Sequence, residues 1–462
     1  MGNLYDMEST RLQNCSKCGL CLSVCPTYKV ALQEHASPRA RLQLIKYYDN
    51  KELISSSGLK EIISKCLMCG ACAAICPSGI NHYSRFMEMR TKMARAHGEK
   101  IAIKSLVYLL ASEFRIKCAA GFAKLGQRIT PQILFEKYDL GNIPLKRFPK
   151  LNKESFRQAV AAIDRSEIAI PETDTKGSVL YFTGCATNYI FDKTGFATIN
   201  ILKAMGYKVI IPEKQTCCGI PMLFHGAKDQ AQQNIVTNIK ALNPENWNTK
   251  NSDLANPDQD TIKAIIVDCP TCGSALKNEY IALKNDFGPE IVEAASKISL
   301  KVIDIMSFIK QESGKQDLSK ALKIIKQDII KSAGIQQDKI IPYNFKLSET
   351  KVTYHLPCHL KNSLQSPNNT ETILKALPAI DYIRAVDADE CCGGGGTFFY
   401  EYPEVSGKIV EGKIENAKKT GAEIWLTDCP VCRINLSGNL KENDNIMVKH
   451  PVEMIGLGGR LF

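Results

Sequence analysis

Residues 178–185 read SVLYFTGC, and residues 351–358 read KVTYHLPC. In both stretches a short run rich in β-branched and aromatic residues ends just before a cysteine, which is typical of a buried strand followed by a loop. Two more runs behave alike, AIIVD before Cys269 and EIWLT shortly before Cys429. Strands that alternate with helical patterns predict an α/β fold with a largely parallel sheet and ligands at the carboxyl ends of the strands. The cysteines fall at those ends.

These stretches belong to a long internal repeat. Each copy has a lone cysteine, then a double cysteine, then a CPxC pair: Cys185, Cys217, Cys218, Cys269 and Cys272 in the first copy, and Cys358, Cys391, Cys392, Cys429 and Cys432 in the second. The tails KVIDIMSFI and MVKHPVEMIG also correspond. Helical patterns, KDQAQQNIVTNIKAL and VSGKIVEGKIENAKKTG, lie between the strands, and Gly421 stands at the expected C-cap. An Asn-, Asp- and Pro-rich surface insertion, residues 243–260, lengthens the first copy.

A second, shorter repeat lies near the N-terminus. CSKCGLCLSVCPTY (residues 15–28) and CLMCGACAAICPSG (residues 66–79) share the spacing Cx2Cx2Cx3CP. This is the bacterial ferredoxin spacing, in which a tight loop supplies three thiolates to a cubane and the fourth ligand reaches the neighbouring cluster. We therefore assign one 4Fe-4S cluster to Cys15, Cys18, Cys21 and Cys76, and the other to Cys66, Cys69, Cys72 and Cys25. Structural zinc is the alternative, although zinc ribbons use paired CxxC arms.

The five-thiol element admits more than one interpretation. Four thiols would complete a cubane, whereas five at adjacent strand ends could hold an opened, non-cubane cluster with a more exposed iron. Zinc, or a single ordinary cluster in one copy, is the simpler alternative, above all for the first copy with its long insertion. The glycine run 393–396 lets the backbone approach closely but lacks the lysine and Ser/Thr of a phosphate-binding loop.

The overall composition restricts the function classes. The chain has 462 residues, which favours two to four domains. It has no apolar run long enough to span a bilayer, and IAIKSLVYLLASEF from Ile101 is expected to form an amphipathic helix. The N-terminus does not resemble a signal peptide, so we expect a cytoplasmic protein. Nineteen cysteines in a reducing compartment indicate metal or redox use rather than disulfides.

The formal charge of +11 does not indicate nucleic-acid binding. A 4Fe-4S core with four thiolates carries about −2, and several such sites would cancel most of the excess. The sequence also has no Rossmann fingerprint, P-loop or Ser-His-Asp pattern. We therefore expect no flavin or nucleotide in this chain, and a substrate that is oxidised on another subunit.

The five-thiol element resembles the cysteine-rich CCG domain of heterodisulfide reductases and of glycolate oxidase and lactate-utilisation iron–sulfur subunits. With CPTY, SPRARLQLIK and CPSG near the N-terminus, the chain from about residue 10 resembles the iron–sulfur subunit of glycolate oxidase or D-lactate dehydrogenase. The resemblance implies two cubane clusters and one or two non-cubane 4Fe-4S clusters on the two sets of five cysteines. It also implies a flavin-binding dehydrogenase partner, a quinone or other electron carrier as acceptor, and peripheral association with the inner face of the membrane.

This interpretation divides the chain into four parts. We expect a helical ferredoxin-type domain over residues 1–100, a helical connector and linker over 101–175, a first CCG domain over 176–312, and a connector with a second CCG domain over 313–462. The leading function is an electron-transfer subunit of a 2-hydroxyacid dehydrogenase complex. The alternative is a catalytic subunit that reduces a disulfide or quinone at a CCG cluster.

The predictions also cover five residues outside the cysteine motifs. His359, next to Cys358, is a candidate proton donor, or a hydrogen-bond partner of a ligand. His225 is expected to be structural. Cys118 lies outside every motif and is expected to be a small buried residue. Arg39 and Arg41, taken as exposed, are candidates for tuning a cluster potential or for contact with a partner, although exposed arginines need no special role.

Overall fold

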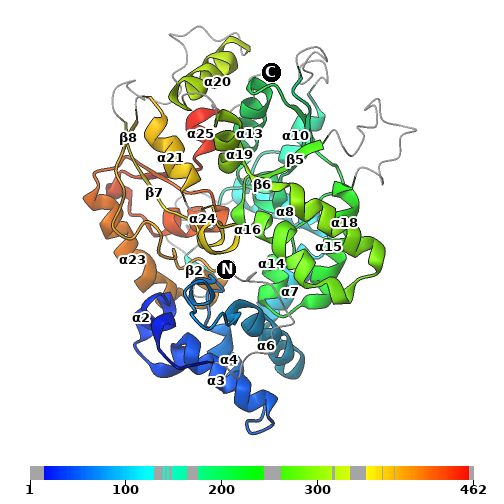
Figure 1. Ribbon diagram of the computed structural model, residues 1–462, viewed down its shortest axis with the longest axis vertical. Helices are drawn as coiled ribbons and strands as arrows, with labels where there is room; N and C mark the ends of the chain where they lie inside the picture. The colour runs from blue at the N-terminus through cyan, green and yellow to red at the C-terminus, as the bar shows by residue number, and fades with distance from the viewer. Residues whose placement is uncertain are drawn as a thin grey trace.

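The computed structural model describes residues 15–129, 139–140, 143–144, 148–163, 175–243, 262–314, 318–332, 350–366, 368–378 and 380–456. A helical N-terminal part forms one end of the molecule, and two α/β parts lie side by side beyond it (Figure 1). This arrangement confirms the predicted fold class. Almost all of the predicted surface insertion lies outside the described residues.

The N-terminal part consists of short helices around the two cysteine loops. They are α1 (Leu20–Ser23), α2 (Pro26–Ala31), η2 (Glu34–Ala36), α3 (Pro38–Asp49), α4 (Ser57–Ser64), α5 (Ala71–Ala74) and α6 (His82–His97). The predicted helix in PRARLQLIKYY is α3, which begins where the Ser37 hydroxyl accepts a hydrogen bond from the Ala40 amide (3.1 Å) and Pro38 occupies the first position. Helices α3 and α4 both pack against α6, and α6 also contacts α5 of the second cysteine loop.

The connector contains α7 (Ile101–Leu110), α8 (Glu113–Ile129), the antiparallel pair β1 (Asp139–Leu140) and β2 (Ile143–Pro144), and α10 (Phe156–Ala161). The stretch predicted as one amphipathic helix is two helices, because the chain turns at Ala111 and Ser112. Among the described helices, none has the length and apolar character to cross a bilayer. Cys118 is exposed on α8, so the prediction that it is buried was wrong. It lies on the outer face of α8, whereas Ala120 is buried.

The first α/β part holds a four-stranded parallel sheet in the order β4-β3-β5-β6. Its elements are β3 (Ser178–Phe182), α12 (Gly184–Tyr189), α13 (Asp192–Ala204), β4 (Lys208–Ile210), α14 (Ile220–Phe224), α15 (Lys228–Leu242), β5 (Ile262–Val267), α16 (Pro270–Ser274), η7 (Ala275–Glu279), α17 (Tyr280–Ala282), η8 (Lys284–Asp286), α18 (Pro289–Lys301), β6 (Val302–Asp304) and α19 (Ile305–Ser313). The strands and helices expected from SVLYF, AIIVD and KDQAQQNIVTNIKAL are thus confirmed as β3, β5 and α15.

After α20 (Leu318–Ser332), the second part repeats this plan with the parallel order β10-β9-β7-β8. Its elements are β7 (Thr350–Tyr354), η10 (His359–Ser363), α21 (Asn369–Ala376), β8 (Ile380–Tyr382), α22 (Phe398–Glu401), α23 (Pro403–Lys419), β9 (Ile424–Leu426), α24 (Pro430–Asn439), η11 (Glu442–Asp444), β10 (Met447–Lys449) and α25 (Val452–Ile455). The Gly421 prediction holds, because the chain leaves α23 through Gly421 at φ 68°. The matching tails form β6–α19 and β10–α25.

The first sheet contacts both of the other parts, because alternate side chains of a strand point to opposite faces of the sheet. On β3, Leu180 and Phe182 enter a core shared with the N-terminal helices, whereas Val179 and Tyr181 enter a core shared with the second sheet. The first sheet therefore lies between the other two parts. The four-part division of the chain remains a proposal, because the parts share hydrophobic cores.

The turn after α14 offers a test of this packing. Gly226 has φ +69°, and a Cβ there would lie 2.6 Å from the carbonyl oxygen of Arg90 on α6. We expect Gly226→Ala to lower the free energy of unfolding by about 3 kcal/mol, from left-handed strain plus overpacking. Gly421→Ala is the matched control, because Gly421 has φ +68° but no atom within 4 Å of its Cβ position. Anaerobic thermal unfolding compares the two. Equal melting temperatures would contradict the close approach of α6.

Candidate iron–sulfur sites

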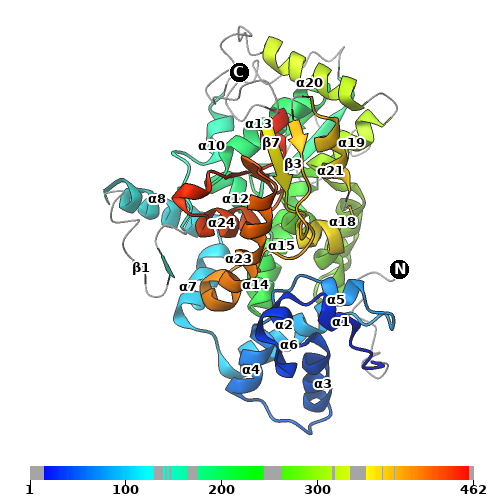
Figure 2. The ribbon, with the colours of Figure 1, turned by 90° about the vertical axis from the view of Figure 1, so that its left-hand side faces the viewer.

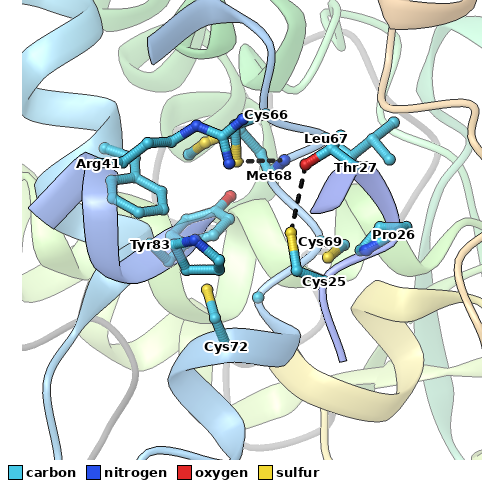
Figure 3. Close-up of a pocket in the computed structure, with 13 residues that line it drawn as sticks. Cys25, Pro26, Thr27, Arg41, Cys66, Leu67, Met68, Cys69, Cys72 and Tyr83 are labelled. Carbon is cyan, nitrogen blue, oxygen red and sulfur yellow. Dashed lines mark hydrogen bonds between the residues drawn. The ribbon is translucent and has the colours of Figure 1, made fainter. Parts of the chain in front are cut away.

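The second ferredoxin-type loop and Cys25 meet at one cavity. The thiols of Cys25, Cys66, Cys69 and Cys72 line it together with Arg41 (Figure 3). Cys25 comes from the first loop, and Sγ of Cys25 lies 3.2 Å from the Thr27 hydroxyl. The exchange of the fourth ligand between the loops, predicted from the spacing, therefore agrees with this geometry.

The thiols at this cavity lie close enough for their thiolate charges to repel one another. Burial raises the pKa of Cys72 well above its usual value, and the neighbouring thiolates of Cys69, Cys66 and Cys25 raise it further. Four thiolates at one cavity are unstable without positive charge between them. An iron–sulfur core supplies that charge, so the donor set fits the group.

The first loop forms a more open site. Burial raises the pKa of Cys21 to about 11, with repulsion from Cys15 and Cys18, whereas hydrogen bonds from the Leu20 amide and Ser16 lower the pKa of exposed Cys18. Helix α5, after which Cys76 follows, packs against α1, which carries Cys21 (Figure 2). Gly19 and Gly70, at φ 83° and 75°, start α1 and α5 in a conformation that favours glycine.

We expect Cys25→Ala to remove the cluster of the second loop, not that of its own loop. About four iron atoms per chain should be lost, with the same electron paramagnetic resonance (EPR) signal that Cys66→Ala removes. Cys15→Ala is the comparison, and should abolish a different signal. If Cys25→Ala and Cys15→Ala remove one common signal, the exchange of ligands is wrong.

In the first cysteine-rich copy the structure brings all five predicted cysteines together. Cys185 follows β3, the double cysteine precedes α14, and Cys269 and Cys272 follow β5. Their thiols interact in the order Cys185, Cys217, Cys218, Cys272 and Cys269. Hydrogen bonds from Cys217 and Cys272 lower the pKa of Cys218 to about 6, despite its burial.

Polar side chains hold the backbone of this double cysteine. Asn234 and Asn238 each donate from Nδ2 to the Cys217 carbonyl (3.1 Å), and the Tyr280 hydroxyl donates to the Cys218 carbonyl (3.1 Å). The second copy uses Asn435, whose Nδ2 donates to the Cys392 carbonyl (2.8 Å). These amides keep the paired thiols aimed at the strand ends.

The five predicted cysteines of the second copy also come together. Cys358 interacts with Cys391, and Cys392 lies between Cys391 and Cys432, with 2.9 Å between Sγ of Cys392 and Sγ of Cys432. Cys432 in turn interacts with Cys429. The repeat therefore builds two similar sites from thiol donors alone, which fits iron–sulfur binding at both.

The two cysteine-rich sites face each other across α16 and η10. Thr271 Oγ1 lies 3.1 Å from Nδ1 of His359 and 4.0 Å from Sγ of Cys429. His359 is buried, stacks on Phe224 and has its pKa lowered to about 4 by burial. The ring is therefore neutral near pH 7. Its role as proton donor remains a prediction.

The second ferredoxin-type loop contacts the second cysteine-rich site directly. The thiol of Cys69 interacts electrostatically with those of Cys391 and Cys358. Asn362 on η10 donates from Nδ2 to the Cys69 carbonyl (2.8 Å). A Cβ at Gly395 would lie 2.6 Å from the Leu67 side chain, so the glycine run allows this contact. Sequence reasoning did not find it.

Several buried residues were missed or misjudged. Arg41 is 1% exposed, so treating it as an exposed arginine was wrong: Nε donates to the Ile62 carbonyl (3.0 Å) and Nη2 to the Lys65 carbonyl (2.5 Å). His225 is partly buried, with Nε2 2.6 Å from the Thr397 hydroxyl, consistent with a structural role.

Two buried aspartates were also missed. Asp268 accepts a hydrogen bond from the Tyr181 hydroxyl (2.6 Å), and Asp428 accepts one from Tyr354 (2.5 Å). Burial raises their pKa values to about 6 and about 7. The matching triplets DCP, residues 268–270 and 428–430, were a signal that could have revealed them.

Fold and sites together define an iron–sulfur protein that combines a dicluster domain with a duplicated cysteine-rich domain. Two sequence families match accordingly: the 4Fe-4S dicluster domain over residues 11–80, and the cysteine-rich domain CCG over 179–277 and 352–437. The chain contains these domains, and its relatives are subunits of oxidoreductases, which supports an iron–sulfur electron-transfer role.

Several relatives match nearly the whole chain, and three of them illustrate the range. The chain is 25% identical to the probable glycolate oxidase iron-sulfur subunit of Bacillus subtilis, over 98% of this chain and 92% of that protein. It is 24% identical to one subunit of the dihydromethanophenazine:CoB–CoM heterodisulfide reductase of Methanosarcina barkeri, over 98% and 95%. It is 23% identical to one subunit of the fumarate reductase (CoM/CoB) of Methanothermobacter marburgensis, over 97% and 73%.

Proposed function

We propose that this chain is the electron-transfer subunit of a flavin-dependent 2-hydroxyacid dehydrogenase complex, with glycolate or D-lactate as the substrate of its partner. The clusters would transfer single electrons from the partner flavin to a quinone or another carrier. The complex would be cytoplasmic, and its partner could hold it at the inner face of the membrane. Similarity to a glycolate oxidase subunit over the full chain supports this assignment.

The observation that carries the proposal is the contact of the second ferredoxin-type loop with the second cysteine-rich part, where Asn362 donates to the Cys69 carbonyl (2.8 Å) and the thiols of Cys69 and Cys391 interact. Cys69 belongs to the second ferredoxin-type set, and Cys391 to the second cysteine-rich set. The residues of one redox site thus border those of the next. Asn362 holds the loop in place through the Cys69 carbonyl.

We assign the sites as predicted. Cys15, Cys18, Cys21 and Cys76 would hold one cubane 4Fe-4S cluster, and Cys25, Cys66, Cys69 and Cys72 the other. Each five-cysteine set would hold a non-cubane cluster, which makes four clusters in all. The neutral Thr271–His359 pair between the two sets is placed to bind a polar group, so His359 stays our candidate proton donor.

The test is reoxidation of the anaerobically reduced full chain by a water-soluble quinone, followed by freeze-quench EPR. We expect the double variant Cys391→Ala/Cys392→Ala to keep its ferredoxin-type clusters in the reduced state at least tenfold longer than the unchanged chain does. Cys217→Ala/Cys218→Ala is the matched control for loss of a cysteine-rich site away from Cys69. An unchanged rate in the first variant would contradict the route.

A catalytic function at the second cysteine-rich site is the alternative, and similarity to a heterodisulfide reductase subunit favours it. On that account the reduced chain alone reduces a disulfide, and Cys391→Ala/Cys392→Ala abolishes the reaction. Disulfide reduction that survives this change excludes catalysis at that site.

A further inference from the structure

The second cysteine-rich site contains a buried histidine that no part of the proposed function uses. His355 follows β7 and is fully buried. A ring nitrogen of His355 and the Sγ atoms of Cys392 and Cys432 all lie within 4.8 Å of one another. Within the described part of the chain, neither ring nitrogen has a hydrogen-bond partner.

A buried imidazole without partners is unfavourable, because its N–H loses the hydrogen bond that water would give it. The Ala388 carbonyl, which accepts a hydrogen bond from the Leu356 amide (2.8 Å), lies near the ring but makes no hydrogen bond with either ring nitrogen. Burial, reinforced by the cation of Lys413, lowers the pKa of His355 well below its usual value. The imidazole ring carries at least one N–H to donate in either protonation state.

The sulfur atoms beside the ring are suitable acceptors. Cysteines bind metal as thiolates, so Sγ of Cys392 and Sγ of Cys432, which lie within 4.8 Å of the ring nitrogen, become hydrogen-bond acceptors when the site is loaded. Five cysteines already form this donor set. A nitrogen ligand is thus not needed, whereas an N–H donor would stabilise negative charge on the sulfur.

The first copy has no equivalent donor. Phe182, the last residue of β3, occupies the position that corresponds to His355, three residues before the lone cysteine. Phe182 is fully buried and belongs to the apolar core that includes Leu180. The two cysteine-rich sites therefore have the same set of thiols, but the donor His355 of the second site is replaced by Phe182 in the first.

We infer that His355 is a positioning residue that donates an N–H hydrogen bond to the thiolate sulfur of Cys392 or Cys432, and so raises the reduction potential of the second cysteine-rich site above that of the first. Hydrogen bonds to ligand sulfur raise such potentials because they stabilise the more negative, reduced state. This inference depends on the proposed function, since it needs a cluster at the second site.

The test is a redox titration of the anaerobically purified full chain, monitored by EPR. The second-site signal is first identified as the one that Cys391→Ala/Cys392→Ala removes. We expect His355→Phe, which copies the first site, to shift this signal to a more negative potential with iron content unchanged. His355→Gln, which keeps an N–H donor, should restore part of the shift. Pulsed EPR should detect a weak histidine nitrogen coupling that His355→Phe abolishes.

Phe182→Leu is the control for packing at the corresponding position, and should leave the second-site potential unchanged. An unshifted potential in His355→Phe would overturn the inference. Loss of iron in both His355 variants would also overturn it, because His355 would then be needed for assembly. If the double cysteine change removes no signal from a loaded protein, the proposed second cluster itself fails, which is a separate outcome.

Discussion

Changing both Cys217 and Cys218 to alanine is expected to remove one cluster, about four iron atoms per chain, and to leave the second cysteine-rich site loaded. The pair is buried in the middle of the row of five thiols, so its loss separates Cys185 from Cys272. Iron and acid-labile sulfide analysis measures the loss, and EPR shows which signals remain.

Cys118→Ala is the control for this change, because Cys118 is exposed and lies outside both repeats. It should leave the iron content unaltered. If Cys217→Ala/Cys218→Ala also retains all of its iron, the first copy holds no cluster on these residues. Loss of zinc instead of iron would support the structural-zinc interpretation of that copy.

Replacing Arg41 with methionine should destabilise the N-terminal part by about 3 kcal/mol and weaken the cluster site of the second loop. The guanidinium holds the end of α4 through the carbonyls of Ile62 and Lys65, just before Cys66. Methionine preserves the volume but leaves both carbonyls without their charged donor. Anaerobic thermal unfolding and the iron content measure both effects.

Arg39, on the same helix, is the matched control. Its side chain is 34% exposed and pairs with Glu34, with 2.7 Å between Nε and Oε1. Ion pairs near the surface contribute little, so Arg39→Met should lower the melting temperature much less than Arg41→Met. Similar losses of stability in the two variants would contradict the structural role of Arg41.

The sequence predicted the elements whose signals are local. The strands before Cys185, Cys269, Cys358 and Cys429 are apolar because parallel strands are covered on both faces. The duplication also predicted two equivalent sites, since matching strand ends meet at one edge of each sheet.

What the sequence could not predict depends on packing between distant segments. The contact of Cys69 with Cys391 joins residues more than three hundred positions apart and results from how α2 and α23 pack. Arg41 is buried because α4 ends beside it, and nothing in the local pattern of α3 indicates that. Cys118 was misjudged for the converse reason: a cysteine in a helix carries no signal of which face is covered.

The most direct test of this account is the metal content of the anaerobically purified chain: iron, acid-labile sulfide and zinc, with EPR on the same sample. The account predicts about sixteen iron atoms and no zinc, which corresponds to four 4Fe-4S clusters with both cysteine-rich sites loaded. About eight iron atoms together with zinc would contradict it, because the cysteine-rich parts would then be a scaffold around a two-cluster ferredoxin domain.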